Sequence, residues 1–122
     1  MDISKAVQKH VGRWAGASVE PRGGDFVEFR VGRRELGHLH GGRLADLPFP
    51  VRVRERLVAL GKAAVHYLHP ETGWVSYHIR GEQDLDAIVE LFRLNYERPW
   101  LNEGRDPVGH TGVKEREGPE SP

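Results

Sequence analysis

Two of the chain's seven histidines, His38 and His40, stand two residues apart in the segment ELGHLHGG. In a β-strand, that spacing places both side chains on the same face of the sheet. Two imidazoles on one face can bind a metal ion, transfer protons near neutral pH or orient a ligand. They can also be polar members of a core, with hydrogen bonds to internal partners. The spacing alone leaves these alternatives open.

Short β-prone runs separated by turn residues predict the strands that position this pair. The runs ASVEPR, DFVEFRV, RELGHLH and RLADLPF follow one another, and they are separated by Gly23-Gly24, Gly32-Arg33 and Gly41-Gly42. Glycine readily adopts the positive φ that two-residue hairpins require, so the pattern predicts an antiparallel meander. The turn HPETGW predicts a second hairpin, between AAVHYLH and WVSYHIR.

Apolar residues at helical spacing predict three helices. We expect them over about residues 3–14, from Pro50 through VRVRERLVAL, and behind Asp84 through LFRLNYER. The order α-ββββ-α-ββ-α groups the strands in sequence, which indicates an α+β fold: an antiparallel sheet with helices on one face. We expect one domain over residues 1–101. Residues 102–122 are rich in Gly, Pro and charge, which is typical of a disordered tail.

Two-residue turns would fix which side chains share a face. They would place His38 opposite Val27 and Ala45, and His66 opposite Tyr77. His38, His40 and His66 would then share the apolar, helix-covered face, whereas Trp74, Ser76, His78 and Arg80 would point away from the helices. Three internal imidazoles have three possible explanations: hydrogen-bonded core histidines, a ligand pocket between sheet and helices, or a three-histidine metal site.

Composition narrows the class of protein. The chain has no cysteine, which excludes thiolate chemistry and disulfides and favours a cytoplasmic location. It has no apolar run of about 18 residues, so we expect no membrane association. The 18 Lys and Arg residues balance the 18 Asp and Glu residues, which argues against nucleic-acid binding.

The motifs themselves resemble a known family. They are Glu35-x-Gly-His-Leu-His-Gly-Gly, then Asp46-Leu-Pro-Phe-Pro, His66, PETGWVS and LFRLNYER, over about residues 24–98. This pattern resembles the luciferase-domain, or luciferase family, proteins: small bacterial proteins whose family includes the luciferase of bioluminescent fungi. A fainter similarity is to MmcQ/YjbR-like proteins, some of which are considered DNA-binding.

The resemblance implies an α+β domain whose motif positions are occupied here by Glu35, His38, His40, Asp46, His66 and Trp74. It implies that the fungal members oxygenate a hydroxylated pyrone without a metal or flavin. We therefore predict a protein that binds a small aromatic or polyoxygenated ligand, with cofactor-independent oxidation as its activity if it is an enzyme. The predicted proton acceptor is His38 or His40, and the candidate ligand-binding residues are Glu35, Asp46, His66, Trp74 and Tyr77, with no metal and no cofactor.

Two alternatives remain open. The first is a non-enzymatic module that self-associates or binds a partner through an exposed face with Trp74, His78 and Arg80, so a homo-oligomer is a possible state. The second is nucleic-acid binding, against which the balanced charge argues.

Overall fold

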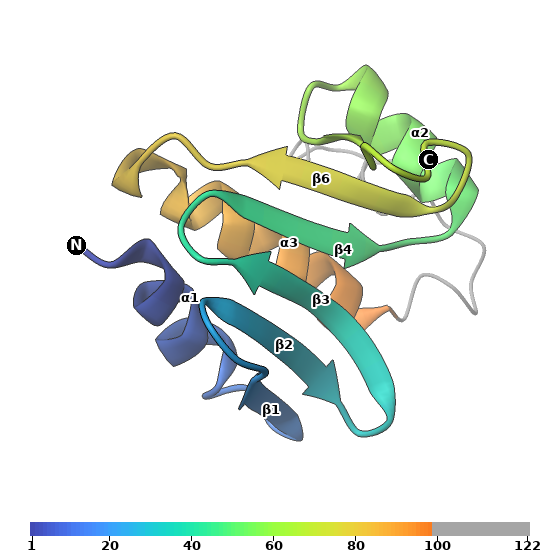
Figure 1. Cartoon of the computed structure of the whole chain (residues 1–122). Helices are drawn as coiled ribbons and strands as arrows, with labels where there is room; N and C mark the ends of the chain where they lie inside the picture. The colour runs from blue at the N-terminus through green and yellow to red at the C-terminus, as the bar shows by residue number, and fades with distance from the viewer. Residues whose placement is uncertain (99–122) are drawn as a thin grey trace, which may run out of the picture.

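The computed structural model describes residues 1–98, and the expected tail over residues 102–122 lies outside this range. Ten elements follow one another along the chain (Figure 1). They are α1 (Ile3–Val11), β1 (Ala17–Pro21), β2 (Phe26–Val31), β3 (Arg34–His40), β4 (Leu44–Pro48), α2 (Val51–Ala59), β5 (Ala64–Val65), β6 (Trp74–His78), the 3-10 turn η1 (Glu82–Asp84) and α3 (Leu85–Glu97). This confirms the α+β class and the order α-ββββ-α-ββ-α.

The six strands form one antiparallel sheet in the order β1-β2-β3-β4-β6-β5. The pairing of β4 with β6 joins the predicted meander to the second hairpin. As a result β3, β4 and β6, which carry most of the candidate site residues, are neighbours in the middle of the sheet. Within residues 1–98, no helix has the length and apolar character needed to cross a membrane.

The core lies between the sheet and the helices α1 and α3. Figure 1 shows α3 crossing behind β3 and β4, with α2 beside β6. The rings of Phe29 on β2 and Phe92 on α3 are both fully buried, with centroids 4.8 Å apart. Val7 and Val11 of α1 are buried in the same cluster. We call the opposite side of the sheet, which carries His38, His40, Asp46 and Ser76, the open face.

The predicted positions of His38 and His40 under the helices are wrong. Val31 pairs with Arg34 as expected at the turn, but Phe29 pairs with Gly37 and Arg30 with Glu35, so Leu36 is an extra residue in β3. One extra residue is a β-bulge, and every side chain beyond it changes face. His38 therefore lies opposite Glu28 on the open face, and Leu39 occupies the core position opposite Val27 that was predicted for His38.

Glycine at position 37 allows this bulge. Gly37 has φ +152°, and a Cβ atom there would lie 2.7 Å from the carbonyl oxygen of Asp46 and 3.0 Å from Cε1 of Phe92. No other residue type fits this backbone and this space without strain. The sequence did contain a signal of the irregularity, because an isolated glycine inside a strand is typical of a bulge.

The second turn also differs from the prediction, because it contains three residues, 41–43, instead of two. His38 consequently pairs with Asp46, and Leu39 with Ala45. The bulge and the longer turn each shift the pairing by one residue, so their effects on β4 cancel. Ala45 and Leu47 remain in the core as predicted, while the two histidines of β3 do not.

The second hairpin is shorter than predicted. The strand β5 contains only Ala64 and Val65, which pair with Ser76 and Val75. His66 therefore follows the strand at the start of a long loop and does not pair with Tyr77. The loop brings His66 to the open face, whereas Tyr77 lies on the helix side, opposite Ala45.

Candidate functional site

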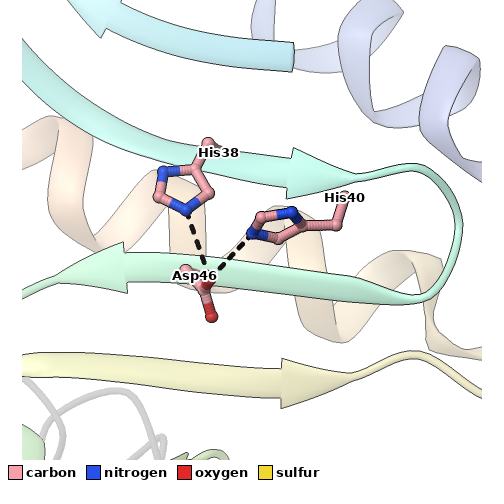
Figure 2. A group of neighbouring side chains, drawn as sticks. All are labelled: His38, His40 and Asp46. Atoms are coloured by element: carbon pink, nitrogen blue, oxygen red, sulfur yellow. Dashed lines mark hydrogen bonds and ion pairs between the residues drawn. The ribbon is translucent and has the colours of Figure 1, made fainter. Parts of the chain in front are cut away.

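Three imidazoles, two from β3 and one from the loop after β5, converge on one carboxylate on the open face. Nε2 of His38 and Nε2 of His40 each lie 3.2 Å from Oδ2 of Asp46, and Nε2 of His66 lies 3.7 Å from the same oxygen. Figure 2 shows His38 and His40 of β3 pointing toward Asp46 of β4. The three histidines are thus gathered on one face, as the sequence predicted, but it is the face opposite the helices.

Asp46 is the centre of this cluster and its least accessible member. Its side chain is 1% exposed, because it lies on a central strand between β3 and β6. Oδ1 accepts a 2.7 Å hydrogen bond from the hydroxyl of Ser76, which is also buried. With Oδ1 occupied in this way, Oδ2 is the oxygen that faces the imidazoles.

His38 lies between two carboxylates. Nδ1 is 3.0 Å from Oε2 of Glu35, and Nε2 faces Asp46. An ionised carboxylate can only accept hydrogen bonds, so both contacts are hydrogen bonds only when both ring nitrogens carry a proton. In neutral imidazole, one of the two nitrogens carries a lone pair that points at a carboxylate oxygen. A second proton or a cation between these two atoms removes this repulsion.

The protonation behaviour of the cluster reflects these contacts. Burial alone would lower the pKa of His38, but the hydrogen bonds to Asp46 and Glu35 and their negative charges outweigh it and raise that pKa above its ordinary value. Burial alone would raise the pKa of Asp46, but hydrogen bonds from His38 and Ser76 and the nearby positive charge lower it. Without a bound cation, the two groups favour an imidazolium–carboxylate pair.

His66 contacts the cluster in a different way. The backbone N–H of Leu68 donates to Nδ1 of His66 at 3.2 Å, so in the neutral ring the proton lies on Nε2, the atom that faces Asp46. The ring of Tyr67 stacks on His66 with centroids 4.7 Å apart. His66 is therefore oriented as a hydrogen-bond donor toward the cluster.

Aromatic rings flank the imidazoles. The ring centroid of Phe26 lies 4.8 Å from that of His38 and 5.2 Å from that of His40. The ring of Trp74 lies 5.3 Å from His38 on the opposite side of the cluster. The open face thus combines flat apolar surfaces with closely spaced nitrogen and oxygen atoms.

The PETGW turn places Trp74 in this arrangement. The hydroxyl of Thr72 donates to the carbonyl of His69 and accepts from the N–H of Trp74. At Gly73, a Cβ atom would overlap the carbonyl of Phe49, so only glycine lets the turn approach the end of β4 this closely. The turn sequence therefore fixes where β6 begins and which face Trp74 occupies.

The model of the luciferase domain matches residues 33–95, just over half of the chain. The chain belongs to the luciferase-domain family. No match was found among the curated proteins or among the solved structures.

The luciferase-domain segment contains nearly the whole cluster. Of the residues described above, only Phe26 precedes the matched range. Phe26 and Ser76 were missing from the predicted site. The alternation in DFVEFRV does place Phe26 beside Glu28 on the polar side of its strand, and an aromatic residue there was a usable signal. Ser76 gave no comparable signal, because its role depends on the pairing of β4 with β6.

Tyr77 does not join the other candidates of the luciferase domain. It lines a separate cavity of about 380 Å³ on the helix side. The other residues that line this cavity include Leu57, Lys62, Leu91, Arg93 and Leu94. This cavity is not the histidine-lined pocket that the sequence analysis considered, because none of the described residues that line it is a histidine.

Proposed function

We propose that this luciferase-domain protein binds a small aromatic or polyoxygenated molecule on the open face, at Glu35, His38, His40, Asp46, His66 and Trp74. The observation that carries the proposal is the convergence of three imidazoles on one buried carboxylate oxygen. This arrangement provides several hydrogen-bonding atoms within the span of one small ligand.

The free-energy cost of burying a carboxylate in this cluster supports a functional role. A buried carboxylate loses hydration, and removing charge from water is unfavourable unless partners compensate for it. Asp46 and its histidine partners contribute little apolar packing to the core beneath them. The pKa of His38 is raised and that of Asp46 is lowered, and shifted pKa values at convergent side chains are more frequent at functional sites than elsewhere.

The flanking rings define the class of ligand. Phe26 and Trp74 lie on either side of His38, which suits a flat ring that stacks on one of them. Hydroxyl or carbonyl groups on such a ring can pair with the imidazoles and with Asp46. A hydroxylated pyrone or a dihydroxybenzene has both properties.

Cofactor-independent oxidation of such a ligand is the activity that we propose. One imidazole in its neutral form, that of His38 or His40, removes a proton from an acidic ring position or hydroxyl group of the ligand. The carbanion form of the resulting anion transfers its electron pair to O2, and a carbon–oxygen bond forms. The peroxide anion takes the proton back, so ligand and O2 together become an organic hydroperoxide.

The binding step is tested by titrating the protein with 4-hydroxy-6-methyl-2-pyrone and with catechol, with amide and indole NMR resonances as the readout. We expect saturable shifts at Trp74, Phe26 and His38. In His38→Ala the Kd should rise at least about tenfold, since a hydrogen bond to a charged group contributes roughly 1.5–3 kcal/mol. His10→Ala, an exposed histidine on α1, is the matched control and should bind like the wild type.

Binding that is unchanged in His38→Ala, or no shift with either compound, would contradict the proposed site. Oxygen consumption with each compound tests the oxidation step separately from binding.

The alternative interaction module has weaker support. It requires an exposed surface that includes Trp74, but this side chain is half-buried, with its ring against those of His38 and His66. Only His78 and Arg80 of the three proposed contact residues are exposed.

A further inference from the structure

We infer that His38, His40 and Asp46 form a binding site for one divalent first-row transition-metal ion, such as Zn²⁺ or Fe²⁺. The inference goes beyond the proposed function, because an ion can bind to these three residues whether or not an organic molecule binds beside them. It also differs from the sequence-based prediction, which named no metal and left open only a site with three histidines, because here Asp46 takes the place of the third histidine.

Two of the three spacings between the ligand atoms fit one ion. Zn–N and Zn–O bonds measure about 2.0–2.2 Å, so two atoms bound to the same ion at angles near 90–110° lie roughly 3.0–3.4 Å apart. Nε2 of His38 and Nε2 of His40 are each 3.2 Å from Oδ2 of Asp46. The three atoms all lie within 4.8 Å of one another.

The surrounding hydrogen bonds are those that orient metal ligands in proteins. A metal-binding histidine usually donates its other ring N–H to a carboxylate, and a metal-binding carboxylate is itself hydrogen-bonded. Glu35 has the first role toward His38, and the hydroxyl of Ser76 has the second toward Asp46. His66, with its Nε2 proton directed at the cluster, is placed to donate to Asp46 or to a group bound on the ion.

The set of ligands limits the class of metal. Two imidazoles and one carboxylate suit Zn²⁺ and Fe²⁺, and the same combination with open positions is typical of non-haem iron oxygenases. Three protein side chains on the ion leave coordination positions for a hydroxyl group of the organic molecule or for water. A bound ion and a free imidazole are therefore alternative means of ionising a ligand at this site.

The test is a Zn²⁺ titration of the tag-free, chelator-treated full-length chain, followed by calorimetry and native mass spectrometry. A histidine tag would bind zinc itself and must be removed. We expect one Zn²⁺ per chain in the wild type, and affinity at least about tenfold weaker in His38→Ala, His40→Ala and Asp46→Asn, since loss of even an outer partner has this effect. The exposed His78 provides the control His78→Ala, which should retain wild-type affinity.

Two further measurements refine the result. The Glu35→Gln variant should still bind one ion per chain, but about 10–100-fold more weakly. Glu35 orients His38 and is not itself a metal ligand. Co²⁺ in place of Zn²⁺ should give visible d–d bands that are lost in His40→Ala. If His38→Ala does not fold, the His40→Ala and Asp46→Asn variants decide the question.

The inference is overturned if the wild type takes up no ion, or if the ligand variants bind it as tightly as the wild type and His78→Ala do. Zinc binding without pyrone or catechol binding would refute the proposed function alone. Pyrone binding to chelator-treated protein that takes up no zinc would refute the metal site alone.

Discussion

The hydroxyl of Ser76 donates a 2.7 Å hydrogen bond to Oδ1 of Asp46, and both side chains are fully buried. Ser76→Ala removes this donor and leaves a buried carboxylate oxygen unpaired. We expect a loss of about 1–3 kcal/mol in the free energy of unfolding, measured by urea denaturation. Ser18→Ala, which removes a hydroxyl near the surface of β1, should change it by less than about 0.5 kcal/mol. Equal effects of the two substitutions would show that the Ser76 bond is unimportant.

Gly37→Ala should destabilise the protein more than other glycine substitutions. Its Cβ atom would meet the backbone of Asp46 at 2.7 Å and the Phe92 ring at 3.0 Å, in a backbone conformation with φ +152°. We expect a cost of roughly 3 kcal/mol or more, from overpacking and backbone strain together. Gly32→Ala, with φ +59° and nothing within 4 Å of the added atom, should cost only about 1–2 kcal/mol. Similar melting temperatures for both variants would contradict this prediction.

Asn95 holds the bulge in place. Its side-chain amide is fully buried and donates to the carbonyl of Leu36, the extra residue of β3, at 2.8 Å. Asn95→Leu should lower the free energy of unfolding by about 1–3 kcal/mol, since that carbonyl loses its donor. It should also shift the imidazole NMR resonances of His38, although Asn95 lies on the helix side. Unchanged His38 resonances would mean that the bulge does not depend on this contact.

Asp84 makes stability depend on pH. It accepts hydrogen bonds from the N–H of Arg80 and the hydroxyl of Tyr77, and these contacts lower its pKa below the ordinary value. A carboxyl with a lowered folded-state pKa stabilises the fold above its unfolded pKa of about 3.9, and this contribution is lost as pH falls through the folded value. Asp84→Asn should therefore be less stable than the wild type at pH 7.

The stability difference between the wild type and Asp84→Asn should narrow below about pH 4. Urea midpoints at pH 7 and pH 3 measure it. Glu71→Gln, at an exposed position of the β5–β6 loop, is the control for a lost charge. A difference that stays constant with pH would exclude the ionised form of Asp84 as its source.

The sequence predicted the order of elements well, because each depends on local signals. The helix behind Asp84, the meander and the PETGW turn all form where turn residues and apolar spacing placed them. The face occupied by His38 and His40 was predicted wrongly, because it depends on one residue of register. The two irregularities, at Leu36 and in the turn after His40, cancel for β4, so the apolar pattern of Ala45 and Leu47 gave no warning.

The composition of the site was partly predictable. Six of its residues were named from the sequence, whereas the contact of Ser76 with Asp46 depends on the pairing of β4 with β6, which no local pattern encodes. The longer loop after β5 likewise brings His66 next to Asp46. The two residues are far apart in the sequence, so local patterns do not predict this contact. Tyr77 lies on the helix side, where the predicted register placed it, but the histidines that were grouped with it lie on the open face.

Because of the bulge at Leu36, β3 contributes side chains both to the core and to the cluster on the open face. Leu36 and Leu39 of β3 pack in the core, while His38 and His40 meet Asp46 on the other side. A side chain on the open face can thus be exchanged without repacking the helices, so the binding preference that we propose for this face would be easier to alter than the fold. Deletion of Leu36 would remove the extra residue but keep His38 opposite Glu28, so both imidazoles would stay on the open face while β3 lost one core side chain.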